Sequence, residues 1–160
     1  MKKLLLIFGV LCFPFFPSTI ISSSFADMAR SETLYKAGRY EEAVKEFLKE
    51  AEKGNLKALD VLGWMYHQGL GVQKDYKQAA DWYRKAAERG YADSQHALGN
   101  MYLEGEGVKK DYSKALELFL QAAEQGHSKA QYSIGMMYFN GDGVERNTEK
   151  AVQWFQKSNQ

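Results

Sequence analysis

Apolar residues recur with helical spacing over most of the chain, in pairs of stretches separated by glycine. Within residues 56–90, Ala58, Leu62 and Tyr66 stand four residues apart and form one face of a helix. After a glycine-rich break, a second stretch presents its own apolar face at Ala79, Trp82, Tyr83 and Ala86. Two amphipathic segments joined by a short turn predict two antiparallel helices that pack against each other.

This two-helix block occurs three times at a spacing of 36 residues, in residues 56–90, 92–126 and 128–160. The identities fall in both predicted helices: Gly63, Gly99 and Gly135; Tyr66, Tyr102 and Tyr138; Ala79, Ala115 and Ala151. A period of this length is typical of repeat architectures, in which neighbouring helix pairs stack and bury their apolar faces together.

Glycines and capping residues mark where the helices begin and end. Residues 69–72 read Gly-Leu-Gly-Val, and the Gly-x-Gly-Val pattern returns in both later blocks. The first glycine suits the left-handed conformation that ends a helix. Asp75, Asp111 and Asn147 are the predicted N-caps of the second helices. Gly63 lies inside a first helix, where glycine costs about 1 kcal/mol relative to alanine. Its recurrence therefore indicates close approach of a neighbouring helix.

Residues 27–54 contain a shortened version of the block. Ala43, Phe47 and Ala51 stand 36 residues before their counterparts in the next block, but the linker is five residues shorter. The sequence therefore predicts an all-α chain, a right-handed α-solenoid of antiparallel helix pairs with about eight helices. We divide it into a shortened pair and three repeats, at residues 27–54, 55–90, 91–126 and 127–160.

The repeated blocks resemble the Sel1-like repeat, a relative of the tetratricopeptide repeat. The residues that carry the resemblance are Ala58, Leu62, Gly63, Tyr66, Gly69, Gly71, Val72, Asp75, Lys77, Ala79, Trp82, Tyr83, Lys85, Ala86, Ala87 and Gly90. The resemblance covers residues 55–160, and the shortened first pair is closer to a plain tetratricopeptide unit. It implies a scaffold that binds peptides or protein surfaces. A cysteine-rich secreted branch of the family has been described as binding or hydrolysing β-lactams, but this sequence lacks the helix-pair cysteines of that branch.

Residues 1–26 have the composition of a secretory signal peptide. Two lysines stand near its start, residues 4–17 are apolar, and Ser-Phe-Ala at 24–26 places small residues at a cleavage site before Asp27. The alternative is an uncleaved membrane anchor, which needs about 20 apolar residues. Two prolines within the apolar region disfavour such a helix. We therefore expect export to the periplasm or the medium, with no stable membrane insertion after cleavage.

Composition and motif spacing argue against several other functions. The formal net charge is +1 without a basic stripe, so nucleic acid is not an expected partner. No cofactor is expected, because the Gly-x-Gly loops lack the preceding strand and the lysine of phosphate-binding motifs. His67, His96 and His127 occupy different repeat positions without metal-ligand spacing, and we interpret them as ordinary surface residues. No nucleophile beside a base and no carboxylate pair is identifiable, so the chain is not expected to be an enzyme.

Positions that differ between repeats indicate a binding surface. They lie on the first helices, on the side opposite Leu62 and Tyr66, and first helices line the concave face in solenoids of this kind. We predict that a partner contacts a stripe made of Lys57, Asp60, Trp64, His67, His96, Asn100, Leu103, Tyr132, Met136 and Phe139. Aromatic residues and methionine are enriched at protein interfaces. The alternative is that these aromatic side chains pack against neighbouring helices.

The leading hypothesis is an exported, non-catalytic scaffold or adaptor that binds a protein or peptide partner on its concave face. Two alternatives stay open at this point: a hydrolase acting on β-lactam or cell-wall-related substrates, and a protein that binds peptidoglycan or another glycan. A further hypothesis is self-association through the last helix. There Ala151, Trp154 and Phe155 have no following repeat to cover them.

Overall fold

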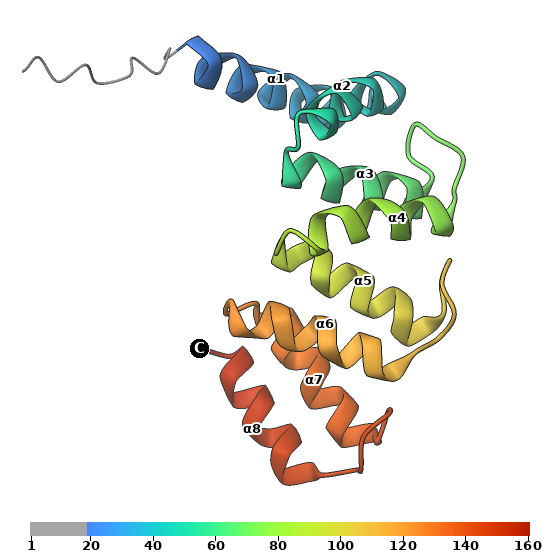
Figure 1. Cartoon of the computed structure of the whole chain (residues 1–160), viewed down its shortest axis with the longest axis vertical. Helices are drawn as coiled ribbons and strands as arrows, with labels where there is room; N and C mark the ends of the chain where they lie inside the picture. The colour runs from blue at the N-terminus through green and yellow to red at the C-terminus, as the bar shows by residue number, and fades with distance from the viewer. Residues whose placement is uncertain (1–18) are drawn as a thin grey trace, which may run out of the picture.

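The computed structural model describes residues 19–160, and this part of the chain is built from helices alone. Figure 1 shows them as successive pairs stacked along the long axis of the molecule. Eight helices occur in the described part: α1 Thr19–Lys36, α2 Tyr40–Glu52, α3 Leu56–Gln68, α4 Tyr76–Ala87, α5 Ala92–Glu104, α6 Tyr112–Glu124, α7 Ser128–Asn140 and α8 Thr148–Ser158. Each helix packs mainly on the helices that precede and follow it in sequence. The predicted all-α solenoid of helix pairs is confirmed.

The second helix of each repeat begins directly after its predicted capping residue. The side chains of Asp75, Asp111 and Asn147 each accept a hydrogen bond from the backbone N–H three residues later, at 2.9–3.1 Å. These bonds satisfy donors that a helix N-terminus otherwise leaves unpaired. The first helices end at Gly69 and at its equivalents in the two later repeats, all in the left-handed conformation.

The glycine inside each first helix permits close helix packing, as predicted. A methyl group at Gly63 would lie 2.7 Å from the ring of Tyr83, which α4 places against α3. Gly99 and Gly135 face the rings of Phe119 and Phe155 in the same way. The aromatic ring of the second helix therefore occupies the space that a side chain on the first helix would need. This contact is the centre of each helix pair.

The second glycine of each Gly-x-Gly loop joins one repeat to the repeat before it. Gly107, with φ +67°, packs so tightly on the start of α4 that a methyl group there would lie 2.3 Å from the carbonyl carbon of Tyr76. Gly71 makes the equivalent approach to the backbone of Tyr40. Packing between repeats therefore accounts for this glycine.

The first helix overlaps the predicted end of the signal peptide. Helix α1 has 18 residues and begins at Thr19, so that the predicted cleavage site before Asp27 falls within it. The rest of the predicted signal peptide, residues 1–18, lies outside the described residues. Within residues 19–160, no helix combines the length and the apolar character that crossing a membrane requires. Cleavage remains a prediction.

Helix α8 carries polar residues where the earlier second helices bury alanine. Ala86 and Ala122 are fully buried, and Ser158 stands at the equivalent position of α8. The Ser158 hydroxyl donates a hydrogen bond to the carbonyl of Phe155 at 2.8 Å. This substitution reduces the apolar surface that α8 presents at the end of the stack. Self-association through this helix stays a prediction.

Candidate partner-binding groove

A groove of about 600 Å³ runs along the first helices of the solenoid. Residues of α1, α3 and α5 and of the start of α7 form most of its wall, so that it extends across all four helix pairs. Its lining residues are Glu32, Tyr35, Lys36, Phe47, Lys57, Asp60, Val61, Trp64, Tyr83, Asp93, His96, Ala97, His127 and Lys129.

Four residues of the predicted stripe line this groove. They are Lys57, Asp60 and Trp64 of α3 and His96 of α5. The side chain of Trp64 is 39% exposed, and its ring meets the ring of Tyr35 edge-on with centroids 5.9 Å apart. A large apolar surface is thus available to a partner on the groove wall.

Three other stripe residues line a separate hollow of about 350 Å³. Leu103 comes from α5, and Tyr132 and Met136 come from α7. Tyr132 is 53% exposed and stacks near Phe155, with ring centroids 5.2 Å apart. The stripe therefore lies along two hollows rather than one continuous groove.

The remaining stripe residues, His67, Asn100 and Phe139, line neither hollow. His67 Nε2 lies 2.8 Å from a carboxylate oxygen of Glu106, and its ring packs on Tyr76 at 4.9 Å between centroids. The Asn100 amide lies 3.4 Å from His96 Nε2. Phe139 is 46% exposed, with the guanidinium of Arg146 5.7 Å from its ring.

The interpretation of the three histidines as ordinary surface residues is wrong. All three are partly buried, and each has polar partners that connect elements of different repeats. His127 caps α7, because its Nδ1 accepts a hydrogen bond from the backbone N–H of Ala130 at 3.1 Å. Its proton must then sit on Nε2, which lies 3.0 Å from Asp93 and donates to that carboxylate. Neighbouring repeats, which the sequence alone does not position, supply these partners.

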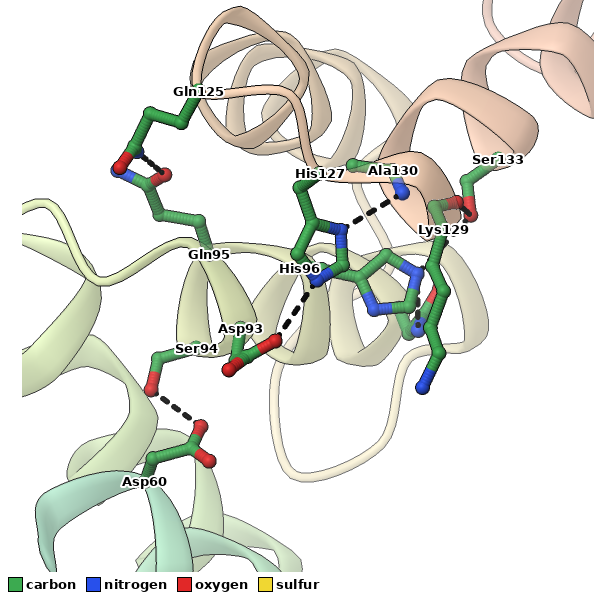
Figure 2. A network of polar contacts seen from close by, with 11 residues as sticks. Asp60, Asp93, Ser94, Gln95, His96, Gln125, His127, Lys129, Ala130 and Ser133 are labelled. Carbon is green, nitrogen blue, oxygen red and sulfur yellow. Dashed lines mark hydrogen bonds and ion pairs between the residues drawn. The ribbon is translucent and has the colours of Figure 1, made fainter. Parts of the chain in front are cut away.

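The centre of the groove is a polar network between α3, α5 and the start of α7, drawn in Figure 2. The Ser94 hydroxyl donates a hydrogen bond to Asp60 at 2.6 Å. Burial raises the pKa of Asp60 to about 6, opposed by the Ser94 hydrogen bond and assisted by the negative charge of Asp93. Burial also lowers the pKa of His96 to about 4. At neutral pH the network therefore contains an ionised Asp60 and an uncharged His96.

Lysine residues stand along the groove on either side of this network. Lys57 forms an ion pair with Glu32 of α1 at 2.5 Å, which lowers the pKa of Glu32 through hydrogen bonding. Lys36 lines the groove from α1, and Lys129 lines it from α7. The groove therefore combines apolar rings with charges of both signs, which suits recognition of a protein segment.

The network contains two serine hydroxyls. Ser133 Oγ lies 3.3 Å from His96 Nε2 but donates its proton to the Lys129 carbonyl at 3.0 Å. Among the side chains of residues 28–160, no three His, Cys, Asp or Glu residues are arranged to hold a metal ion. Ser94, which adjoins a carboxylate, is fully buried and uses its hydroxyl proton to bind Asp60. A nucleophile must reach its substrate and pass its proton to a base. Ser94 has no access to a substrate in this arrangement.

Sequence reasoning missed the part of the groove that α1 contributes. Glu32, Tyr35 and Lys36 line it, and Tyr35 packs on Trp64. Only part of the signal was present: when Tyr35 is aligned with Tyr66, Lys36 corresponds to the stripe residue His67, whereas Tyr35 itself falls on the predicted core face. The stripe was defined from the three full repeats alone, and its continuation on α1 was therefore not predicted.

The comparisons identify the repeats. Residues 56–91, 92–127 and 128–159 match the family described as Sel1 repeat. A Sel1 repeat protein from Oxalobacter formigenes has 35% identity and a TM-score of 0.75 over 83% of this chain and 53% of its own. A protective antigen of uropathogenic Escherichia coli with an SLR fold has 37% identity and a TM-score of 0.81 over 88% of this chain and 32% of its own.

A third solved structure, cysteine rich protein B of Helicobacter pylori, has 29% identity and a TM-score of 0.54 over 56% of this chain and 67% of its own. A search of curated proteins found no match. The chain spans about half of the Oxalobacter protein and a third of the Escherichia coli antigen. Proteins built from these repeats are typically scaffolds for protein interaction. With three matched repeats over residues 56–159 and two relatives above 30% identity, the chain belongs to the Sel1 repeat family.

Proposed function

We propose that this protein is an exported, non-catalytic scaffold that binds a segment of a protein or peptide partner in the groove along its first helices. The observation that carries the proposal is the exposed ring of Trp64 on the wall of a groove of about 600 Å³. Binding energy at interfaces concentrates in a few large side chains, and tryptophan is prominent among them. The groove also supplies hydrogen-bonding groups on both sides of that ring.

A different hollow, of about 410 Å³, lies beside α4, α5 and α6. It is lined mainly by long polar side chains, including Arg84, Lys114 and Gln121. No tryptophan or phenylalanine lines it. Flexible polar side chains lose conformational entropy when a partner fixes them. The groove beside Trp64 is therefore the better candidate.

A pull-down from the cell envelope tests the proposal. We expect the tagged chain to retain a protein that the Trp64→Ala variant retains much less, because the variant loses an apolar anchor while the fold persists. Trp82→Ala on α4, whose residue does not line the groove, is the control for loss of a tryptophan. Equal capture by all three chains would refute binding in the groove.

Exposed aromatic rings also stack on sugars, and insoluble peptidoglycan therefore serves as a second bait. Retention on peptidoglycan that disappears with Trp64→Ala, without any protein partner, would favour the glycan-binding alternative. Turnover of nitrocefin by the wild-type chain would favour the hydrolase alternative. We expect neither result.

Export is a separate part of the proposal, with its own test. Intact-mass analysis of the exported protein is expected to show a chain that starts at Asp27, because small residues occupy the positions that a signal peptidase reads in Ser24-Phe25-Ala26. A full-length chain that stays with the membrane fraction after a salt wash would contradict cleavage.

A further inference from the structure

We infer that the groove binds a partner segment carrying a single basic residue, lysine or arginine, and that the positive charge of this residue lies against Asp60. This inference rests on the proposed function, because it states which chemistry the groove recognises. Its evidence is the arrangement of charges and aromatic rings around Asp60.

Asp60 is a partly buried carboxylate without an ion-pair partner among residues 28–160. Its hydrogen-bond partner is the neutral hydroxyl of Ser94, at 2.6 Å. No lysine, arginine or histidine of residues 28–160 lies within ion-pair distance of it. Removing a carboxylate from water without a compensating positive charge is costly. A cation supplied by a partner would recover part of that cost.

The neighbours of Asp60 in the network increase the negative character of the site. Asp93 adds a second carboxylate, and its charge acts on Asp60. His127 hydrogen-bonds to Asp93 through Nε2 at 3.0 Å and lowers the pKa of Asp60, but its effect is smaller than the opposite effect of Asp93. His96 is uncharged at neutral pH, since burial lowers its pKa to about 4. The centre of the groove therefore carries negative charge.

Aromatic rings stand beside this carboxylate. Trp64 follows Asp60 by one helical turn on α3 and therefore lies on the same side of that helix. Tyr35 packs edge-on against it, and both rings line the groove. A lysine or arginine side chain can place its aliphatic stem on such rings and its charge on a carboxylate. Glutamine can make the apolar contacts but supplies no charge.

The lysines along the groove limit how many basic residues a partner can carry. Lys57 is paired with Glu32, whereas neither Lys36 nor Lys129 has an ion-pair partner among the described residues. These two lysines belong to α1 and α7, whereas Asp60 belongs to α3 between them in the stack. A run of basic residues would meet these charges, so we expect one basic residue flanked by neutral or acidic ones.

Affinity selection with peptide mixtures tests the inference. The probes are acetylated and amidated heptapeptides whose central residue is Arg, Lys, Gln or Glu and whose other positions are mixed uncharged residues. The immobilised full chain is expected to retain the Arg and Lys mixtures about tenfold more than the Gln mixture, and the Glu mixture least; a tenfold ratio corresponds to about 1.4 kcal/mol. Oligo-lysine of the same length is expected to bind more weakly than the single-Arg mixture.

The Asp60→Asn variant tests the contribution of the negative charge of Asp60 separately from the size of its side chain. Asparagine keeps the size of the side chain and an oxygen that accepts the Ser94 hydrogen bond, and thermal melts verify that the variant is folded. We expect the preference for Arg and Lys over Gln to disappear. Asp81→Asn, which removes an exposed carboxylate on α4 paired with Arg84, should leave the preference unchanged.

Retention of the peptide mixtures is also measured as a function of pH, because a purely structural role of Asp60 would not make retention depend on its protonation. The pKa of Asp60 is about 6, so lowering the pH from 7 to 5 protonates this carboxyl in the free chain. Retention of the Arg mixture should fall over this range in the wild type and much less in Asp60→Asn. Several titratable or polar groups act on Asp60 or lie next to it. They are Tyr83 on α4, Tyr91 at the N-cap of α5, Asp93 and Ser94 on α5, and His127 at the N-cap of α7.

The outcomes separate the inference from the proposed function. Equal retention of the Arg, Lys and Gln mixtures, or a preference that survives Asp60→Asn, overturns the inference and leaves groove binding standing. Failure of every mixture to bind a chain that still captures a protein in the pull-down also overturns it. A basic preference that Asp60→Asn removes supports the inference, even if the envelope pull-down captures no protein.

Discussion

Gly107→Ala is expected to destabilise the chain by about 4 kcal/mol, which would place it among the most disruptive single substitutions. Two effects combine at this position. The left-handed conformation, with φ +67°, costs a residue other than glycine about 1–2 kcal/mol. In addition, the new methyl group would lie 2.3 Å from the Tyr76 carbonyl carbon. Backbone atoms cannot turn aside as a side chain can, so the two repeats must separate.

Gly126→Ala is the matched control for that substitution. Gly126 has φ +80°, but no atom lies within 4 Å of the place that a methyl group would occupy. We therefore expect a loss of about 1–2 kcal/mol, from backbone strain alone. Urea unfolding followed by circular dichroism measures both. Equal losses for the two variants would mean that the contact of Gly107 with α4 is unimportant for repeat packing.

Leu62→Ala and Trp64→Ala are expected to differ strongly, although the two residues lie on the same helix. Leu62 is 0% exposed in the core between α3 and its neighbours, so its truncation should cost about 2–5 kcal/mol. Trp64 is 39% exposed, and its loss should cost about 1 kcal/mol through its contact with Tyr35. Thermal and urea unfolding measure the two costs. Early melting of Trp64→Ala to the extent seen for Leu62→Ala would assign Trp64 to the core.

The parts of the fold that the sequence predicted depend on local interactions. The N-caps at Asp75, Asp111 and Asn147 act within one turn of a helix, and the glycine at the end of α3 acts through its own backbone conformation. Each of these local requirements is met by a particular residue type at a fixed position in the repeat, and it can therefore be recognised from the sequence. Threefold repetition then made each signal readable, because the same residue returned at the same spacing.

The parts that sequence reasoning missed depend on which repeats come together in space. Asp60 meets Ser94, and Asp93 meets His127, across 34 residues of sequence. The equivalent positions of the other repeats hold different residue types, so the repeat pattern does not reveal these two pairs. The division of the stripe into two hollows has the same origin. Trp64 lines the groove along α3, whereas Tyr132 lines the separate hollow between α5 and α7.

The sequence alone does not indicate how far α1 extends toward the N-terminus. Its helix runs continuously from Thr19 to Lys36, through residues that composition assigned to a leader. Small and hydroxyl residues are typical of the end of a signal peptide, but they are also compatible with a helix. Leu34, Tyr35 and Gly38 resemble the end of a first helix in the repeats, but this resemblance does not show which residues of α1 face α3.

The most direct test of groove binding is a calorimetric titration of the folded chain with the segment of its captured partner. We expect Trp64→Ala to weaken binding about thirtyfold, a loss of about 2 kcal/mol, while its melting temperature stays close to that of the wild type. Phe139→Ala, in which the truncated ring lies outside the groove at 46% exposure, shows whether the partner extends along α7. Unchanged affinity in Trp64→Ala, measured on folded protein, would contradict the account.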